Sequence, residues 1–401
     1  MTVTDTALTA DEQRVSELVD ELLTKYPPKS VSAQEFLGAQ FDLGLAWVHF
    51  PVGHGGLDLN PKLQKLINER IYAVGAPNPM YRNPIGHGMC GPTVVVWGSE
   101  EQKQRYLRPL FTGEEIWCQL FSEPGAGSDF AGLSSKGVRD GDEWVVNGQK
   151  VWTTLGHLAR WGLLVVRTDA EAVKHAGLTA FVVDMHAPTV EVRPLRQMTG
   201  EAEFNEVYFT DTRIPNSEML GKPGDGWRVS LTTLMNERVS IGGSIPQKGS
   251  GTIAHLIQTW KNVPADRKNA AELDEVMKLW SRAEVLRLTN IRANQQRKKG
   301  DPGPEGSIGK MASANLNKDI YELVMNLMGA DGMLYGSYEM IRPETASGFD
   351  TLQKAFLRSR ANSIEGGTTE VMLNILGERV LGLPGDVRVD RDKPWSQVPR
   401  N

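Results

Sequence analysis

The chain has 401 residues and a formal net charge of −5, without a dominant basic stripe, which argues against nucleic acid as the main partner. Its only cysteines, Cys90 and Cys118, are too few for a disulfide framework, and the 7 histidines lack the spacing of metal ligands. We find neither a signal-peptide layout nor an apolar stretch near the ~20 residues that span a bilayer, so we expect a cytoplasmic protein without membrane or metal contacts.

Residues 1–115 predict an N-terminal helical domain. The first helix has a capping box at residues 9–12 and one apolar stripe, and it ends before Pro27. Further helices are expected at residues 61–74 and 93–110. Residues 86–91 match the G-x-G-x-x-G pattern, but Asn83 and Pro84 precede it where a strand is required, so we exclude a dinucleotide-binding turn.

Residues 116–222 predict a β-domain and residues 223–401 a C-terminal helix bundle. Short segments rich in β-branched and aromatic residues follow one another without helices between them, at residues 143–146, 161–166, 178–183 and 206–209. This order indicates an antiparallel barrel or sandwich. The helical period returns at residues 227–242, 270–299, 307–328 and 369–381. The fold class is therefore a multidomain α+β protein.

Two short runs inside the β-domain carry most of the functional information. Residues 122–129 read SEPGAGSD, a turn whose glycines let a flat ligand approach the backbone and whose hydroxyls can bond to polar ring edges. Residues 147–154 read NGQKVWTT and follow a hairpin signal at Asp140-Gly141, so an indole and two hydroxyls come together at the end of a strand. Taken alone, Trp152 could equally be a core tryptophan.

In this order and spacing, the two runs resemble the flavin-binding β-domain of the acyl-CoA dehydrogenase family. The segments GSEEQK at 98–103 and LFTGE at 110–114 resemble the family's helix before that domain. The segments NLMGADG at 326–332 and GGTTEV at 366–371 resemble its adenosine-binding element and the loop that closes over the flavin. The resemblance covers nearly the whole chain and implies FAD as the cofactor and an acyl-CoA as the substrate.

The resemblance also implies roles for individual residues. Those expected around the isoalloxazine and ribityl groups are Gln119, Phe121, Ser122, Gly127, Ser128, Trp152 and Thr154. Asn326 and Gly329 are expected near the adenosine, and Thr368 and Glu370 near the phosphate and ribose. On the substrate side we expect Ser128, Arg238 and Gly366, with the backbone N–H of Gly366 helping to stabilise the charge on the thioester oxygen.

Desaturation of an acyl-CoA requires a carboxylate that takes the α-proton while flavin N5 takes the β-hydride. Many family members carry this base as Glu-Gly-Thr, but here Glu365 is followed by two glycines, which moves it one residue out of register. A minority branch, which includes isovaleryl- and long-chain acyl-CoA dehydrogenases, places the base on an earlier helix before an arginine. This chain has that element in Glu237-Arg238, so we favour Glu237 and keep Glu365 as the alternative.

One family element is missing. We do not find the Arg-x-x-Phe-Gly segment whose arginine reaches the FAD pyrophosphate across the dimer; Lys261, Arg267 or a partner subunit are the candidates to replace it. The sequence therefore predicts a dehydrogenase of fatty-acid β-oxidation type that passes electrons to an electron-transfer flavoprotein, as a homodimer or homotetramer. The alternatives are a subunit of a hetero-oligomeric dehydrogenase, and a flavin oxidase or monooxygenase. The acyl chain is left open.

Overall fold

The structure, a computed structural model, describes residues 8–242, 245–298, 305–345, 350–387, 390 and 392–399. Its N-terminal part is helical, as expected, and Thr9 and Glu12 form the predicted capping box at the start of α1. The expected helix at 93–110 is two helices, because Ser99 caps a new helix with its own capping box. The elements are α1 (Ala10–Lys25), α2 (Ala33–Asp42), α3 (Leu63–Ala73), η1 (Pro79–Tyr81), η2 (Gly86–Cys90), α4 (Gly91–Trp97) and α5 (Glu100–Thr112).

The glycine-rich segment 86–91 is a π-helical turn that leads into α4. It comes after the 3₁₀ turn η1 in the chain. The side chain of Asn83, between the two turns, accepts a hydrogen bond from the backbone N–H of Gly86 at 3.2 Å. The segment is therefore packed inside the helical domain and does not follow a strand as a dinucleotide-binding turn would.

The middle of the chain is one 8-stranded sheet, with the path β6-β7-β3-β2-β4-β5-β8 and β1 beside β4. Most neighbours are antiparallel as expected, but β1 and β2 both run parallel to β4. The strands are β1 (Trp117–Leu120), β2 (Lys136–Asp140), β3 (Glu143–Thr154), β4 (Trp161–Arg167), β5 (Leu178–Asp184), β6 (Val190–Pro194), β7 (Phe204–Pro215) and β8 (Met219–Leu220), with the turns η3 (Phe130–Gly132) and η4 (Asn216–Glu218).

Alternate residues of β4 enter two different cores. Leu163 and Val165 pack with the N-terminal helices and with Val229 of the next helix, while Leu164 and Val166 pack against residues of β3 and β7. The strand is therefore buried on both faces, which explains its nearly continuous apolar sequence.

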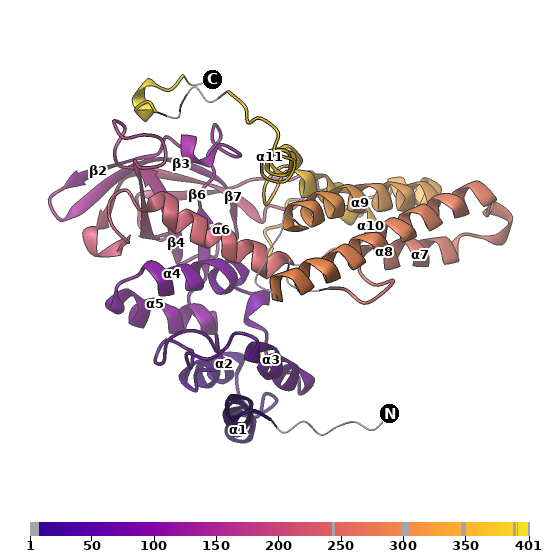
Figure 1. The fold of residues 1–401 in the computed structure, drawn as a ribbon, viewed down its shortest axis with the longest axis horizontal. Helices are drawn as coiled ribbons and strands as arrows, with labels where there is room; N and C mark the ends of the chain where they lie inside the picture. Colours follow the sequence, from indigo (N-terminus) through magenta and orange to yellow (C-terminus); the bar gives the residue numbers. More distant parts are fainter. Residues whose placement is uncertain are drawn as a thin grey trace.

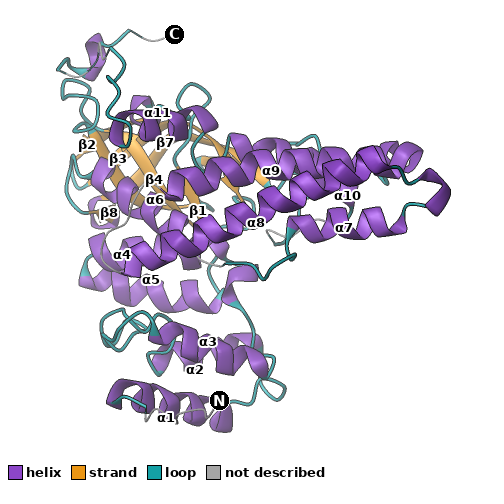
Figure 2. Ribbon diagram, turned by 45° about the vertical axis from the view of Figure 1, so that its right-hand side comes forward, coloured by secondary structure: helices purple, strands orange, loops and turns teal. Residues whose placement is uncertain are grey.

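The C-terminal part is a helix bundle that extends away from the sheet, as Figure 2 shows. Its helices α7, α8 and α9 share a core of their own, which includes Leu256, Leu279 and Ile320. The sequence did not predict α7 or α10. The elements are α6 (Gly226–Gly242), α7 (Thr252–Asn262), η5 (Ala265–Arg267), α8 (Ala270–Lys298), α9 (Glu305–Met328), η6 (Gly329–Met333), α10 (Leu352–Ser359), η7 (Arg360–Ser363), α11 (Thr369–Arg379) and η8 (Trp395–Gln397).

Helix α6 links the three parts of the molecule. Its Thr233 hydroxyl lies 2.9 Å from the Thr93 hydroxyl of α4, and its Thr232 hydroxyl accepts a hydrogen bond from the Trp97 indole at 2.9 Å. Figure 1 shows α6 lying between the sheet and the N-terminal helices. In the described part of the chain, no helix combines the length and hydropathy needed to cross a bilayer.

Candidate active site

The two runs singled out in the sequence meet in space. The backbone N–H of Val151 donates to the carbonyl of Ser122 at 2.9 Å. The Lys150 ammonium, which is fully buried, donates to the carbonyl of Phe121 at 3.0 Å and to Oε1 of Glu123 at 2.8 Å. The end of β3 is therefore fastened to the start of the glycine-rich turn by one buried ion pair and two hydrogen bonds to its backbone carbonyls.

The Glu123 carboxylate also fastens the far side of the turn. It accepts hydrogen bonds from the backbone N–H groups of Ser134 and Ser135 at 2.7 and 3.0 Å and from the Ser134 hydroxyl at 3.0 Å. Burial by itself raises the pKa of Glu123, but the charge of Lys150 and these hydrogen bonds outweigh it and lower the pKa to about 2. Glu123 is thus ionised throughout the physiological range. The sequence did not reveal this pair, because nothing local marks either residue as buried.

Between these anchors the turn is open. Glu123 and Ala126 exchange backbone hydrogen bonds of 3.1 and 3.0 Å, which closes a tight turn and leaves Gly125, Gly127 and Ser128 exposed. A Cβ built on either glycine meets no atom within 4 Å, so a ligand has room to approach the backbone here.

Phe121, the residue directly before the SEPGAGSD run, differs from the residues that follow it. Its side chain is buried and stacks on Phe130 with the ring centroids 4.9 Å apart. Its ring therefore supports the turn from the protein side, while Ser122 and Gln119 are half-buried beside it.

Trp152 is not a core tryptophan, because 57% of its surface is exposed. The register between β3 and β7 shifts between Lys150 and Thr153, and Trp152 adopts a φ of 61°, which is uncommon for a bulky residue. This bulge turns the indole out of the sheet, where it makes an edge contact with Phe204 at 5.7 Å between centroids. Thr154 follows, half-buried and paired with Phe204 across the strands.

The loop before α11 is shaped by two glycines with positive φ, 61° at Gly366 and 94° at Gly367. A Cβ at Gly367 would lie 2.6 Å from the Met372 side chain, so the loop cannot accept a larger residue there without repacking. Thr368 caps α11 by accepting a hydrogen bond from the N–H of Val371 at 3.2 Å, and Glu370 is exposed in the first turn.

Both carboxylate oxygens of Glu365 accept hydrogen bonds. Arg358 donates to them in a fork, at 2.9 and 2.7 Å, and the Asn362 amide donates to Oε1 at 2.9 Å. Arg358 also lies 3.9 Å from the Glu203 carboxylate of the β-domain, so this arginine bridges the two domains. Glu365 therefore belongs to a domain contact.

Position 237 lies in α6, one helical turn after Thr233. The side chains of Glu237 and Arg238 fall outside the described part of the structure. Their assignment as base and substrate contact therefore stays a prediction from the sequence.

The adenosine element lies apart from the two runs, at the end of α9. Asn326 is exposed, and Gly329 begins η6 with a φ of 63°. A Cβ built on Gly329 would lie 3.2 Å from the guanidinium of Arg267, so this arginine, one of the two sequence candidates, approaches the element directly. Lys261, the other candidate, is in the last turn of α7.

A second contact between the β-domain and the bundle was not predicted. Residues 199–202 pair with the segment around Ile341, whose carbonyl accepts from the N–H of Ala202 at 2.7 Å. Beside it, Lys354 of α10 forms an ion pair with Glu201 at 2.5 Å. The same β6–β7 connection leads into Phe204, so the bundle supports the strand against which Trp152 rests.

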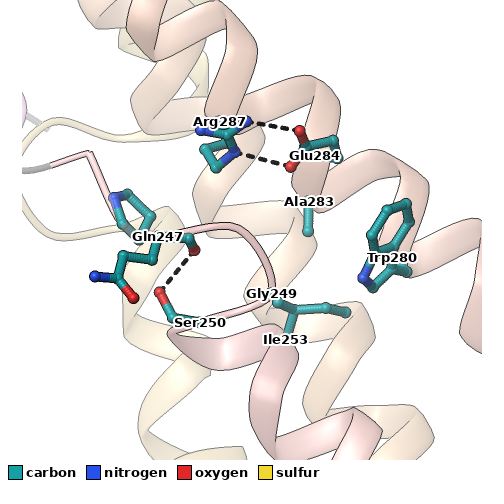
Figure 3. A pocket seen from close by; sticks show the side chains of 9 residues that line it. Gln247, Gly249, Ser250, Ile253, Trp280, Ala283, Glu284 and Arg287 are labelled. Atoms are coloured by element: carbon teal, nitrogen blue, oxygen red, sulfur yellow. Dashed lines mark hydrogen bonds and ion pairs between the residues drawn. The ribbon is translucent and has the colours of Figure 1, made fainter. Parts of the chain in front are cut away.

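A shallow pocket lies elsewhere, between α8 and the start of α7 (Figure 3). Glu284 and Arg287 form an ion pair at its rim, and Trp280 lies at one side. The pocket is lined by Pro246, Gln247, Gly249, Ser250, Ile253, Trp280, Ala283, Glu284 and Arg287. It shares no residue with the two runs. Within the described ranges, no group of three or more side chains is suited to hold a metal ion.

Comparison with known families matches three consecutive models to the chain. They are the acyl-CoA dehydrogenase N-terminal domain at residues 11–114, the middle domain at 118–212 and the C-terminal domain at 224–381. Solved structures show the same fold at low identity. The Tcur3481-Tcur3483 steroid ACAD has a TM-score of 0.69 at 22% identity, covering 96% of this chain and 100% of that one. The ChsE4-ChsE5 complex from Mycobacterium tuberculosis has a TM-score of 0.67 at 24% identity, with coverage of 96% and 100%.

Curated relatives extend the likeness to the sequence. Acyl-CoA dehydrogenase IpdE1 of Mycobacterium tuberculosis is 36% identical over 351 residues, which is 86% of each chain. Acyl-CoA dehydrogenase FadE29 of the same organism is 30% identical over 358 residues, or 87% of each chain. The three domain matches and these relatives agree with the order of helices, sheet and helices described above. The chain therefore belongs to the acyl-CoA dehydrogenase family of flavoprotein oxidoreductases.

Proposed function

We propose that this chain binds FAD and desaturates an acyl-CoA thioester to the trans-2-enoyl-CoA, with the electrons passing to an electron-transfer flavoprotein. The observation that carries the proposal is the exposed Trp152 indole, fastened through Lys150 and Glu123 beside an open glycine-rich turn. An apolar flat face next to free backbone and hydroxyl groups fits a planar ring with polar edges.

The residues that fit the cofactor are the ones described above. Trp152, Thr154, Ser122 and Ser128 would hold the ring system and its polar arm, together with Gly127 of the turn and with Gln119 and Phe121, which precede it. Asn326, Gly329, Thr368 and Glu370 would meet the nucleotide end. FAD, when bound, supplies the hydride acceptor. The chain's own residues orient the acyl-CoA through Ser128, Arg238 and the backbone N–H of Gly366.

We assign the role of the base that removes the α-proton to Glu237. The fork from Arg358 and the Asn362 amide already engage both oxygens of the Glu365 carboxylate, so this side chain is occupied in a contact of its own. The same contacts direct Glu365 to the β-domain. Glu237 instead belongs to α6, the helix that contacts the N-terminal domain through Thr233.

The substrate class is proposed as long, branched or bulky acyl groups. The family branch that places its base on the earlier helix handles such substrates, and one fold neighbour is named a steroid ACAD. Activity with an artificial acceptor across short, long and steroid side-chain acyl-CoA thioesters tests this proposal. Steady-state peroxide release in the same assay separates a dehydrogenase from an oxidase.

Replacing Trp152 with Ala should weaken FAD retention, because it removes the largest exposed apolar face beside the turn. We expect protein that is folded but partly colourless after gel filtration, with a raised dissociation constant for added FAD. Tyr81→Ala is the matched control, since Tyr81 is 72% exposed on the N-terminal domain, and it should keep its flavin. Folded wild-type protein that neither retains nor binds FAD would refute the proposed function.

We also expect an oligomer. Helix α8 exposes Leu273, Met277, Val285 and Leu288, which fall within one arc of the helix, while its other face packs in the bundle. Multi-angle light scattering should give a dimer or tetramer, and an FAD-loaded monomer would contradict this.

A hetero-oligomer is the second candidate, because the Arg-x-x-Phe-Gly segment is missing and two of the fold neighbours are named as pairs of chains. The visible spectrum of the chain purified alone discriminates between the two. One FAD per subunit favours the homo-oligomer, whereas a folded protein that stays colourless until a second subunit is co-expressed favours the hetero-oligomer.

A further inference from the structure

The last described part of the chain returns to the β-domain. Residues 392–399 lie beside the β-domain, as Figures 1 and 2 show. The N–H groups of Trp395 and Ser396 donate to the carbonyls of Ala172 and Ala170 at 3.0 and 2.9 Å, and Val173 bridges to Pro394. These backbone bonds dock residues 394–396 on the connection between β4 and β5.

One side chain of this segment covers a buried arginine. Trp395 is buried, and its ring lies 4.2 Å from the guanidinium carbon of Arg167. Arg167 in turn donates to the carbonyls of Ala131 and Leu133, at 2.6 and 3.2 Å. These carbonyls belong to η3 and the residue after it, directly behind the glycine-rich turn. Trp395 therefore closes the outer side of the arginine that holds this end of the turn.

A second side chain of the segment acts on the turn through a lysine. Asp390 accepts a hydrogen bond from the Lys174 ammonium at 2.8 Å, and Lys174 also lies 2.6 Å from the Asp129 carboxylate. Asp129 is the last residue of the SEPGAGSD run. Lys174 is largely buried, whereas the Asp129 side chain is mostly exposed. The lysine thus joins the end of the SEPGAGSD run to Asp390.

We propose that Asp390 and Trp395 are positioning residues that fix the glycine-rich turn from outside. We call Asp390 and residues 392–398 the C-terminal clasp. It acts through Lys174 on Asp129 and through Arg167 on η3, while Lys150 holds the opposite side of the turn. The proposal rests on the proposed function only in that this turn is the one assigned to flavin and substrate.

Hydrogen exchange of the purified full chain, followed by mass spectrometry, tests the clasp without an activity assay. Trp395→Ala should raise the exchange rate of residues 123–133 about tenfold, because the aromatic face on Arg167 is lost. Trp395→Phe keeps an aromatic face and should restore most of the protection. Gln397→Ala, on an exposed residue of the same 3₁₀ turn, is the matched control and should exchange like the wild type.

Asp390→Asn tests the second contact. It removes the charge that faces Lys174, and we expect a rise in exchange of about threefold in the same segment, which shrinks in high salt because the pair is partly exposed. With an acyl-CoA substrate, both Trp395→Ala and Asp390→Asn should raise KM several-fold and change kcat by less than about twofold.

Three results would overturn the clasp: unchanged exchange in residues 123–133, an equal rise throughout the chain, or no recovery in Trp395→Phe. Measuring hydrogen exchange both with and without added FAD separates the clasp proposal from the proposed function. A chain that never binds flavin contradicts the proposed function, while its exchange pattern still decides whether the clasp exists.

Discussion

Glu237→Gln should leave FAD bound, while the reduction of the flavin by a good acyl-CoA substrate falls by roughly 10²–10⁴-fold. The amide keeps the size of the side chain but cannot accept the α-proton, and this range is the usual cost of losing a general base. Anaerobic stopped-flow bleaching of the flavin measures the step directly. The visible spectrum of the variant before mixing confirms that its cofactor site is intact.

Glu365→Gln is the matched control for this experiment. The Arg358 fork and the Asn362 amide already engage its carboxylate, so the substitution weakens a domain contact and should change flavin reduction only mildly. If Glu365→Gln abolishes reduction and Glu237→Gln stays near the wild type, the base is Glu365 and not Glu237.

The second large effect is expected on stability. Lys150→Met should lower the free energy of unfolding by about 3–5 kcal/mol, because it leaves the Glu123 carboxylate buried without its counter-charge. Urea unfolding followed by circular dichroism gives the value. Lys278→Met removes a lysine from an exposed helix ion pair and should leave the urea unfolding curve close to that of the wild type. The double variant Lys150→Met/Glu123→Gln should recover much of the loss, and its failure to do so would show that the charge is not the cause.

The ion pair between Lys150 and Glu123 also makes a contribution to stability that depends on pH. The pKa of Glu123 is lowered from 4.5 to about 2 in the folded chain, so its carboxylate stabilises the fold fully above pH 4.5. That stability is lost as the pH falls from 4.5 towards 2. The double variant should therefore show a flatter decline in this window than the wild type, and equal declines would contradict the assigned pKa.

The sequence predicted the local structure of those parts of the candidate site that are close together in the chain. The SEPGAGSD turn and the exposed Trp152 follow from glycines, hydroxyls and a hairpin signal within a few residues of one another. The pair that joins them could not be predicted, because Glu123 and Lys150 are 27 residues apart and a fully buried lysine is rare.

Other differences also depend on distant partners. The parallel pairing of β1 with β4 joins strands that are distant in the sequence, which periodicity does not report. The contact between Ile341 and residues 199–202 joins two irregular segments, and α7 and α10 are short helices whose partners lie in α9. Each becomes visible only when the domains are assembled.

The position of the C-terminal clasp has a practical side. An affinity tag or fluorescent protein attached after residue 401 follows Trp395 of the clasp by only a few residues in the sequence. Helix α1 lies at the far end of the molecule (Figure 1), so a fusion before it is remote from that turn. Differently tagged preparations of one and the same protein should therefore differ in apparent acyl-CoA affinity, and the choice of tag becomes an experimental variable.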